Sequence, residues 1–224
     1  MEDHNNGSRD HAHGHGHGHT NDQGLKSMLR YLRSAPGMWR SEVNDAVVGL
    51  LAPQPGETVV DIGAGVGAGT MRAARSGASV IAVEPTSYMR RILRIRRFLQ
   101  RSRSRITVLD GAAEKLPLPD ASVDAVWAVN TMHHWIDTER GAAEICRVLR
   151  PGGRVVLVDE DFENVEHPHF ERFAERHGDG EHHAFSMVDA EQMGELLVTA
   201  GITEVEATKR QLASLPVIAL VGRT

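Results

Sequence analysis

Short β-branched runs alternate with stretches of helical pattern along this 224-residue chain, and this alternation restricts the folds open to it. The helical stretches lie at 68–76, 87–101 and 138–149, after two earlier predicted helices at 25–34 and 40–52. The β-branched runs predict strands at Thr58–Ile62, Ser79–Val83, Ile106–Leu109, Val123–Val129 and Val155–Val158. Strands joined by crossover helices form βαβ units, so the sequence predicts a parallel sheet with helices on both faces.

The C-terminal part departs from this alternation. A last helix is predicted at Asp189–Ala200, ended by Gly201, followed by strands at 203–208 and 216–221. The link of about seven residues is too short for a parallel crossover, so we expect an antiparallel hairpin. The predicted fold is an α/β, Rossmann-like sheet of seven strands, mostly parallel, with an antiparallel C-terminal hairpin.

The N-terminal segment 1–24 has a different composition from the rest of the chain. Its only apolar side chains are Met1 and Ala12, so we expect it to be disordered and the folded domain to span 25–224. It carries histidines at every second position: His11, His13, His15, His17 and His19. Neutral imidazoles on a flexible chain bind zinc or nickel, so metal handling and an inert solubilising tail are the two interpretations.

Composition excludes several classes of protein. The net charge of −5 argues against nucleic acid as a partner by bulk charge. The single Cys146 rules out an intramolecular disulfide and any metal site built from several cysteines. No apolar run approaches the roughly 20 residues of a membrane span, and the N-terminus lacks the apolar core of a signal peptide. The sequence therefore predicts a soluble, cytoplasmic protein without a membrane span.

The segment VVDIGAGVGAGT, residues 59–70, is a predicted strand that runs into a glycine-rich turn and then a helix. Gly63, Gly65 and Gly67 lack Cβ atoms, so the backbone can turn sharply there and lie against a flat ligand. The turn follows the first strand, at the edge of the sheet where doubly wound folds bind ligands. This edge is the predicted cofactor site.

The glycine pattern alone leaves two classes of cofactor open. With Ala68 the first two glycines satisfy the dinucleotide pattern G-x-G-x-x-A, and Glu84 lies where a ribose-binding acid belongs. Asp61 favours a cationic ligand instead, because dinucleotide folds generally carry an apolar residue at that position. The alternative interpretation of Asp61 is a strand-end acid that caps the next helix.

Five segments resemble, in order, the motifs of class I S-adenosylmethionine-dependent methyltransferases, in particular the type 11-like domain of enzymes that act on small molecules. They are DIGAGVG (61–67), VEP (83–85), GAAEKLP (111–117), VDAVWAVNTMHHW (123–135) and EICRVLRPGG (144–153). The flanking helices and the terminal hairpin extend the resemblance to 25–224. It implies a methyltransferase with S-adenosylmethionine as cofactor and a small-molecule acceptor as substrate.

The resemblance also implies the cofactor-binding residues. They are Asp61, Gly63, Ala64, Gly65, Gly67, Glu84, Pro85, Gly111, Ala112, Ala113 and Asn130. Glu84 would accept hydrogen bonds from both ribose hydroxyls, as the paired oxygens of a carboxylate can. Asp61 and the first glycines would face the methionine part, with Asn130 near its end.

The adenine contact departs from the family pattern. Ala112 and Ala113 would lie near the adenine, but the family often has Asp where Ala112 stands, accepting from the adenine amino group. That acceptor is missing here, and Asp110 and Glu114 are the nearby candidates to replace it.

His133 and His134 follow the fourth strand at the mouth of the predicted site. Methyl transfer depends on holding the nucleophile close to the methyl carbon, and a general base is needed only where the nucleophile must lose a proton. Either histidine could be that catalytic base. In the alternative interpretation, the pair shapes the pocket and forms hydrogen bonds.

Two charged segments lie outside the motifs. Eight arginines occur between Tyr88 and Ile106: Arg90, Arg91, Arg94, Arg96, Arg97, Arg101, Arg103 and Arg105. With Met89, Ile92, Leu93 and Leu99 facing the sheet, most of the arginines would face outward, as a solvated helix face or a surface for anions. The second segment, 159–188, is rich in acids and histidines and is predicted to be a polar substrate lid, with a metal site as the alternative.

The predicted function is methyl transfer from S-adenosylmethionine to a small-molecule acceptor by in-line displacement. An NAD-type oxidoreductase on a similar sheet and a non-catalytic metal-handling or ligand-sensing protein are the alternatives. An RNA methyltransferase that uses the Arg90–Arg105 segment is a minor alternative, because no interleaved aromatic residues support base stacking.

Overall fold

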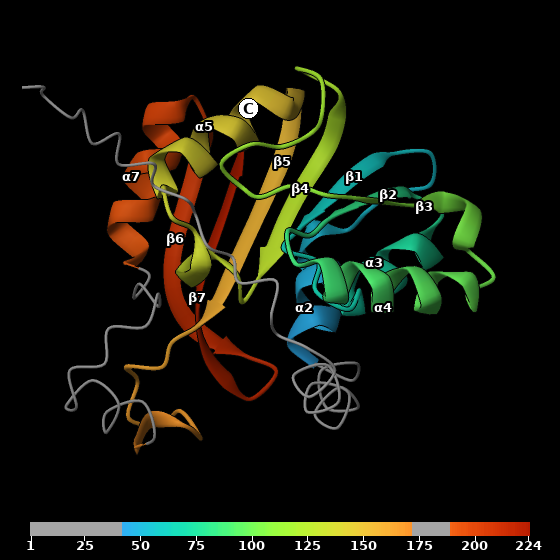
Figure 1. The fold of residues 1–224 in the computed structure, drawn as a ribbon. Helices are drawn as coiled ribbons and strands as arrows, with labels where there is room; N and C mark the ends of the chain where they lie inside the picture. Colours follow the sequence, from blue (N-terminus) through green and yellow to red (C-terminus); the bar gives the residue numbers. More distant parts are fainter. Residues whose placement is uncertain (1–41, 172–188) are drawn as a thin grey trace, which may run out of the picture. The chain divides into compact units, whose positions relative to one another are not determined.

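In the described part of the chain, seven strands form one sheet with the order β3-β2-β1-β4-β5-β7-β6 (Figure 1). The structure is a computed structural model and describes residues 42–171 and 189–224. All of these residues belong to one compact unit, Ala35–Thr224. β1 to β5 pair in parallel, whereas β7 runs antiparallel to both β5 and β6. The predicted fold class is confirmed.

The strands begin and end close to the predicted positions. β1 (Thr58–Ile62), β2 (Ser79–Val83), β3 (Ile106–Leu109) and β4 (Val123–Val129) match their predictions. β5 is longer than predicted and spans Leu149–Glu160, because the Pro-Gly-Gly segment stays in the strand and shifts its register with β4 by a bulge. The predicted strand Val155–Val158 is therefore too short at both ends.

The C-terminal hairpin is tighter than predicted. β6 spans Thr203–Leu212 and β7 spans Leu215–Arg223, so two residues link them instead of about seven. Ala213 and Ser214 both have positive φ values, 50° and 69°. Two such residues give the turn the twist that matches the flanking strands, so the pairing can continue to the end of the hairpin.

Helices cover both faces of the sheet. One face carries α2 (Glu42–Leu51), α3 (Ala68–Ala73) with its 3₁₀ extension η1 (Ala74–Ser76), and α4 (Ser87–Phe98). The other face carries α5 (Thr138–Val148) and α7 (Ala190–Ala200). Short 3₁₀ turns lie at η2 (Arg103–Arg105) and η3 (Met132–His134). Each layer has its own apolar core, so the sheet is buried on both sides.

Local sequence explains where these helices begin and end. The Asp137 and Asp189 side chains accept from backbone N–H groups in the first turns of α5 and α7, and Gly201 ends α7 in a left-handed conformation. α4 ends at Phe98, three residues earlier than predicted, which leaves Leu99 74% exposed rather than facing the sheet. The predicted helix 25–34 lies outside the described residues, and no helix within them is long and apolar enough to cross a bilayer.

Candidate functional site

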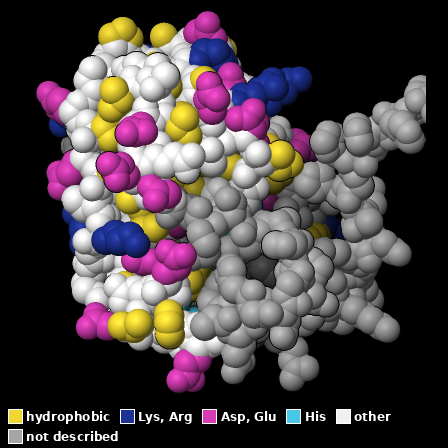
Figure 2. Space-filling view, turned by 90° about the vertical axis from the view of Figure 1, so that its left-hand side faces the viewer, with side chains coloured by type: hydrophobic (Ala, Val, Ile, Leu, Met, Phe, Trp, Pro, Cys, Tyr) yellow, Lys and Arg dark blue, Asp and Glu magenta, His cyan; other side chains and the backbone are white. Residues whose placement is uncertain are grey.

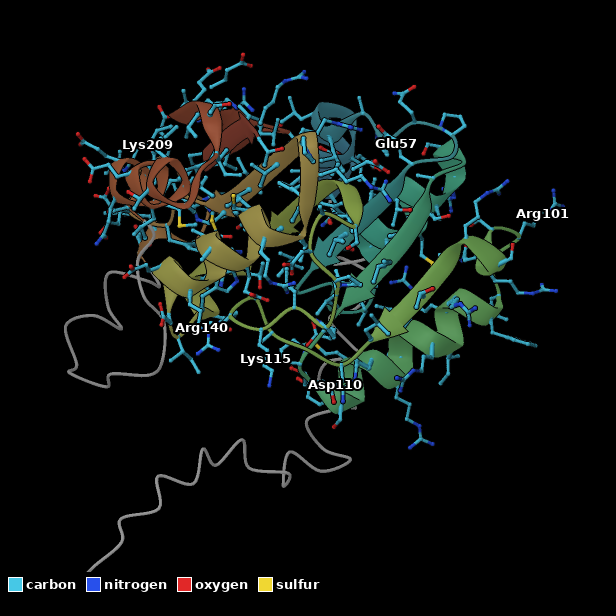
Figure 3. The ribbon with its side chains drawn as sticks, turned by 90° about the horizontal axis from the view of Figure 1, so that it is seen from above. Glu57, Arg101, Asp110, Lys115, Arg140 and Lys209 are labelled. Carbon is cyan, nitrogen blue, oxygen red and sulfur yellow. The ribbon has the colours of Figure 1, made fainter. Side chains whose placement is uncertain are left out.

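The carboxyl ends of the five parallel strands meet at one edge of the sheet. The register pairs Ile62 with Val83 and with Ala128, and Val83 with Leu109, so the residues that follow these strands are neighbours. They include the glycine turn, Glu84 and Asp110, and in Figure 3 Asp110 and Lys115 lie at this edge with Glu57 at the opposite one. We call this edge the candidate site. It brings together the predicted residues from four separate segments, those that follow β1, β2, β3 and β4.

The glycine turn connects β1 to α3 and has left-handed backbone at Gly63, Gly65 and Gly67, with φ of 66°, 53° and 82°. A Cβ at Gly63 would lie 2.2 Å from Thr131 Oγ1, so the absence of a side chain there is required by packing. A Cβ at Gly65 would meet nothing closer than a carbonyl oxygen at 4.0 Å. The turn therefore has open space at Gly65, where a ligand can approach the backbone.

The rest of the turn is held by backbone bonds. Ala64 N–H donates to the Val83 carbonyl at 3.1 Å, and Gly67 N–H donates to the Ala64 carbonyl at 2.8 Å. Gly67 precedes α3, and a Cβ there would lie 3.0 Å from the Leu93 side chain. Since Leu93 belongs to α4, this glycine allows α3 and α4 to pack closely.

Asp61 lies at the end of β1 and points to the α3 side of the sheet. Its carboxyl group is 4% exposed and accepts from the Thr70 hydroxyl of α3 at 2.5 Å. Burial raises its pKa to about 7, with a contribution from the nearby Glu84 charge, although the Thr70 hydrogen bond opposes this shift. The contact agrees with the alternative interpretation, an acid that holds the first turn of the next helix.

Glu84 follows β2 and reaches the glycine turn. One carboxylate oxygen accepts from Gly65 N–H and the other from Thr86 N–H, both at 2.8 Å. The side chain is 4% exposed. Each oxygen has a second acceptor position, so the carboxylate can hold the turn and still accept from a pair of hydroxyl groups. Pro85, next in the chain, is exposed.

The segment after β3 shows which side chains are near the predicted adenine position. Asp110 pairs with Arg90 at 2.8 Å, and Glu114 accepts from the backbone N–H of Ile136 at 2.7 Å. Ala112 is half-buried and bridges to Lys115, whereas Ala113 is part of the core. A Cβ at Gly111 would lie 2.8 Å from Pro117, so this glycine is needed for packing. Both candidate replacement acids already have protein partners.

Asn130 directly follows β4, has a positive φ of 52° and binds the end of β5. Its amide N–H donates to Glu160 Oε1 at 2.6 Å, and its amide oxygen accepts from Glu160 N–H at 3.0 Å. The second Glu160 oxygen lies 3.1 Å from His167 Nε2. The His167 side chain is fully buried, so this chain of contacts connects the strand end to the segment beyond it.

His133 lies between a buried acid and a second histidine. Its Nδ1 is 2.8 Å from Asp159 Oδ2, and its Nε2 is 3.0 Å from His134 Nε2. Asp159 is 1% exposed and also accepts from the backbone N–H groups of Thr131 and His133. A carboxylate only accepts, so His133 carries a proton on Nδ1 in this contact, and a single proton can lie between the two Nε2 atoms. His133 is buried and His134 exposed.

The start of the predicted polar lid contains buried acids. Asp159, Asp161 and His167 are 1%, 3% and 4% exposed: Asp159 lies in β5, Asp161 directly follows this strand, and His167 packs beyond its end. Residues 172–188 lie outside the description. Asp159 and Glu160 were not predicted as site residues, although they share the signal of Asp61 and Glu84, an acid where a parallel strand ends.

Two further observations concern metal ligands and a surface groove. Within residues 42–171 and 189–224 no three histidine, cysteine or acidic side chains converge as metal ligands, and the tail histidines lie outside these ranges. A groove of about 720 Å³ between α7 and β6 is lined by Gly194, Lys209 and their neighbours and contains none of the predicted site residues.

Residues 60–157 match the family model described as a methyltransferase domain. Over 108 residues the chain is 42% identical to an uncharacterized methyltransferase of Mycobacterium tuberculosis, an alignment that covers 48% of this chain and 42% of that protein. Over 122 residues it is 33% identical to a demethylmenaquinone methyltransferase of Clavibacter sepedonicus, covering 54% of this chain and 47% of that protein. The chain thus spans about half the length of these curated relatives.

A solved S-adenosylmethionine-dependent methyltransferase from Aquifex aeolicus has the same fold, with a TM-score of 0.64 at 20% identity over 82% of this chain and 92% of that one. Residues 60–157 therefore match a methyltransferase domain, and the described chain has the fold of a solved S-adenosylmethionine-dependent methyltransferase. Both findings agree with the family that the five motifs resemble, the class I methyltransferases, whose cofactor is S-adenosylmethionine.

Proposed function

We propose that this protein transfers a methyl group from S-adenosylmethionine to a small-molecule acceptor. The observation that carries this proposal is the glycine turn joined to Glu84 at the carboxyl edge of the sheet, with open space at Gly65. When bound, S-adenosylmethionine supplies an electrophilic methyl group on a sulfonium sulfur. The protein's part is to hold that group and the acceptor's nucleophilic atom in line.

The residues at the edge fit such a cofactor. The Glu84 oxygens would accept from the two ribose hydroxyls at the positions that are not used by backbone N–H groups. Gly65 would let the ligand approach the turn. Asn130 would lie near the methionine end. Asp110 pairs with Arg90 through one oxygen only, so its carboxylate keeps acceptor positions for the adenine amino group, and backbone or water is the alternative.

The two histidines and Asp159 form a path for a proton. With His133 donating to Asp159, a proton taken up by the histidine pair ends on His133, next to a buried carboxylate that stabilises the imidazolium. An acceptor with a hydroxyl or amine nucleophile loses its proton on methylation, and this path would receive it. The pair would then be the general base, with Asp159 as the residue that positions it.

A small-molecule acceptor is supported by the names of relatives. One is a demethylmenaquinone methyltransferase, and another, 32% identical over 120 residues, is a 27-O-demethylrifamycin SV methyltransferase of Amycolatopsis mediterranei. The acceptor of this chain would contact the segments that follow β4 and β5.

The alternatives have less support. The dinucleotide-binding sheet has the strand order 3-2-1-4-5-6, whereas here an antiparallel β7 lies between β5 and β6, which disfavours an NAD-type oxidoreductase. Metal handling by the tail histidines stays a prediction. The arginine segment that would support RNA methylation also exposes apolar side chains, which disfavours RNA as its partner.

Calorimetric titration with S-adenosylhomocysteine and, separately, with NADH tests the cofactor. We expect the first alone to bind, and Glu84→Ala to weaken it roughly ten- to a hundredfold, because a charge-assisted hydrogen bond contributes about 1.5–3 kcal/mol. Glu57→Ala is the matched control, since Glu57 also accepts from a backbone N–H but lies at the opposite edge of the sheet (Figure 3). Binding of NADH in place of S-adenosylhomocysteine, or unchanged affinity in a folded Glu84→Ala variant, would contradict the proposed site.

A further inference from the structure

The outer side of α4 combines exposed apolar side chains with arginines. Ile95, Phe98 and Leu99 are 58%, 72% and 74% exposed, among the most exposed large apolar residues of the described chain. Arg91 and Arg94 lie one turn before them on the same side of the helix, because residues three and four apart share a face. Leu93, on the opposite side, is fully buried in the core below the helix, and Ile92 is buried beside the exposed face.

Among the described residues, the exposed arginines of this surface have no acidic partner. Exposed Arg91, Arg94, Arg101, Arg103 and Arg105 form no ion pair with any residue in 42–171 or 189–224. Two other arginines of the segment have different roles. Arg90 is buried and donates to the Glu84 carbonyl and to Asp110, and Arg96 is half-buried and donates to the Val66 carbonyl.

The apolar and basic groups lie next to each other. The guanidinium carbon of Arg103 is 6.0 Å from the centre of the Phe98 ring, and Arg97 donates to the Arg103 carbonyl, which holds the turn after α4 against the helix. Arg101 points away from the sheet beyond the end of α4 (Figure 3). We call the set Arg91, Arg94, Ile95, Phe98, Leu99, Arg101 and Arg103 the α4 surface.

The α4 surface is unlike the opposite end of the sheet. Figure 2 shows acidic side chains spread over the face formed by α7 and β6, with few basic ones among them. Although the net charge of the chain is −5, eight of its 25 lysines and arginines lie between Tyr88 and Ile106, a segment without any acid. Local charge of one sign directs the choice of partner even where the net charge has the other sign.

We propose that the α4 surface docks the protein peripherally on a bilayer that contains anionic phospholipids. Arginines next to exposed aliphatic and aromatic side chains are the composition of helices that lie in the membrane interface, with apolar groups between the acyl chains and guanidinium groups at the phosphates. Nucleic acid would pair with the arginines and stack on Phe98, but it has no apolar surface on which Ile95 and Leu99 could be buried. The apolar residues therefore favour a lipid surface over RNA.

The docking surface is separate from the candidate site. α4 begins two residues after Pro85, next to the site edge, and Phe98 and Leu99 lie at the far end of the helix, some three turns away. Changes there should leave cofactor binding intact. This separation makes lipid binding testable independently of the methyl-transfer proposal.

Sedimentation of the full-length protein with vesicles tests the proposal. Vesicles of phosphatidylcholine with an equal part of phosphatidylglycerol should bind the protein, vesicles of phosphatidylcholine alone should bind it weakly, and added salt should weaken binding. Arg94→Glu with Arg101→Glu should lower the partition coefficient at least about 25-fold, because each arginine near an anionic surface contributes roughly a fivefold factor. Phe98→Ser with Leu99→Ser should lower binding at low and high salt alike.

Matched controls lie on other elements. Val198→Ser removes an apolar side chain that is 59% exposed on α7, and Arg140→Glu reverses an exposed charge on α5. Both should bind vesicles as the wild type does, and all variants should keep their affinity for S-adenosylhomocysteine. In Phe98→Trp, vesicles with phosphatidylglycerol should shift the added tryptophan emission to shorter wavelength.

Three outcomes would overturn the proposal. The first is equal binding to the two kinds of vesicle, or none to either. The second is wild-type binding by the α4 variants. The third is a loss of vesicle binding in the arginine variant alone, together with binding of single-stranded RNA that is tighter than binding to the vesicles and that Leu99→Ser leaves unchanged, which would identify a nucleic-acid surface.

Discussion

Asp61 and Glu84 show how two acids at neighbouring strand ends can differ in their surroundings. Glu84 accepts from two backbone N–H groups, one of which belongs to the glycine turn. Asp61 is buried on the α3 side with one hydroxyl donor, so its charge is less well solvated. An acid at the end of a parallel strand therefore has two different roles here: Glu84 offers acceptor positions toward the site edge, whereas Asp61 anchors a helix.

Asp61 predicts a pH dependence of stability. Its carboxyl group loses its proton near pH 7 in the folded chain and near its ordinary value of 3.8 in the unfolded chain. Between pH 3.8 and pH 7 this carboxyl group is ionised in the unfolded chain but still protonated in the folded chain. The free energy of unfolding therefore falls as the pH rises through this range, by about 4 kcal/mol at most. Asp61→Asn cannot ionise and keeps an acceptor oxygen for Thr70.

The expected result is that the melting temperature of Asp61→Asn falls less than that of the wild type between pH 4 and pH 8. Thermal unfolding followed by circular dichroism across this range measures it. Glu204→Gln, which neutralises an exposed acid, is the control and should follow the wild type. Parallel curves for Asp61→Asn and the wild type would mean that the Asp61 carboxyl group is ionised at no cost to folding.

The histidine pair predicts a pH dependence of turnover. If His133 receives the acceptor's proton, His133→Ala should lower turnover by roughly 10²–10⁴-fold and remove the rate dependence near pH 6.5, with cofactor affinity unchanged. Asp159→Asn should shift that pH dependence, because the amide no longer favours the Nδ1–H form of the His133 ring. The order in which cofactor and acceptor bind should not change. The measurement is kcat against pH with an acceptor found by screening.

A role in shaping the pocket gives a different result. His133→Ala and His134→Ala would then lower turnover modestly and leave the form of the pH profile intact. Circular dichroism of each variant separates these cases from a loss of folding, which the burial of His133 and Asp159 makes a real outcome.

At the scale of elements, the β6–β7 turn carries backbone strain that one substitution can relieve. Ser214 is exposed and has a φ of 69°, a conformation that costs a residue with a Cβ about 1 kcal/mol or more. Ser214→Gly should raise the melting temperature by roughly 2–4 °C, the effect of about 1 kcal/mol in a protein of this size. Differential scanning calorimetry measures the shift.

The control substitution should change the melting temperature in the opposite direction. Ala143 is exposed in the middle of α5, where glycine is unfavourable by about 1 kcal/mol, so Ala143→Gly should lower the melting temperature by a similar amount. A fall in both variants would show that the turn at Ser214 is not strained.

The elements differ in how well the sequence predicts them. The first four strands follow from β-branched runs bounded by turns, and their bounds match. β5 and the hairpin were predicted too short, because proline and glycine in β5 and polar residues in β6 resemble loops, while pairing with neighbouring strands keeps them extended. Tertiary pairing of this kind leaves no local signal.

The site was predictable to a similar degree. Strand ends and glycines identified the edge of the sheet, and the family resemblance supplied the residues. The partners of those residues were not predictable, because Asp159 reaches His133, and Asn130 reaches Glu160, only once β4 and β5 lie in register. The exposure of Leu99 depended on where α4 ends, a boundary that helical periodicity locates poorly.

At the scale of the whole molecule, we expect the first 24 residues to be dispensable for the domain. They contain two apolar side chains, too few to contribute a core, so their deletion should leave the melting temperature and the affinity for S-adenosylhomocysteine unchanged. The same deletion should remove most of the weak uptake of nickel or zinc, measured by equilibrium dialysis. A clear fall in melting temperature would show that this segment packs on the domain.

The position of β7 between β5 and β6 has a consequence for the order in which the protein folds during synthesis. The edge strand β6 joins the sheet only through β7, which leaves the ribosome after it. The nascent chain can pair β1 to β5 early, but β5 keeps an unpaired border until the last strand emerges. Such a border is prone to associate with other chains. The two-residue turn shortens this period, because a hairpin closes within microseconds and can then join β5 as one unit.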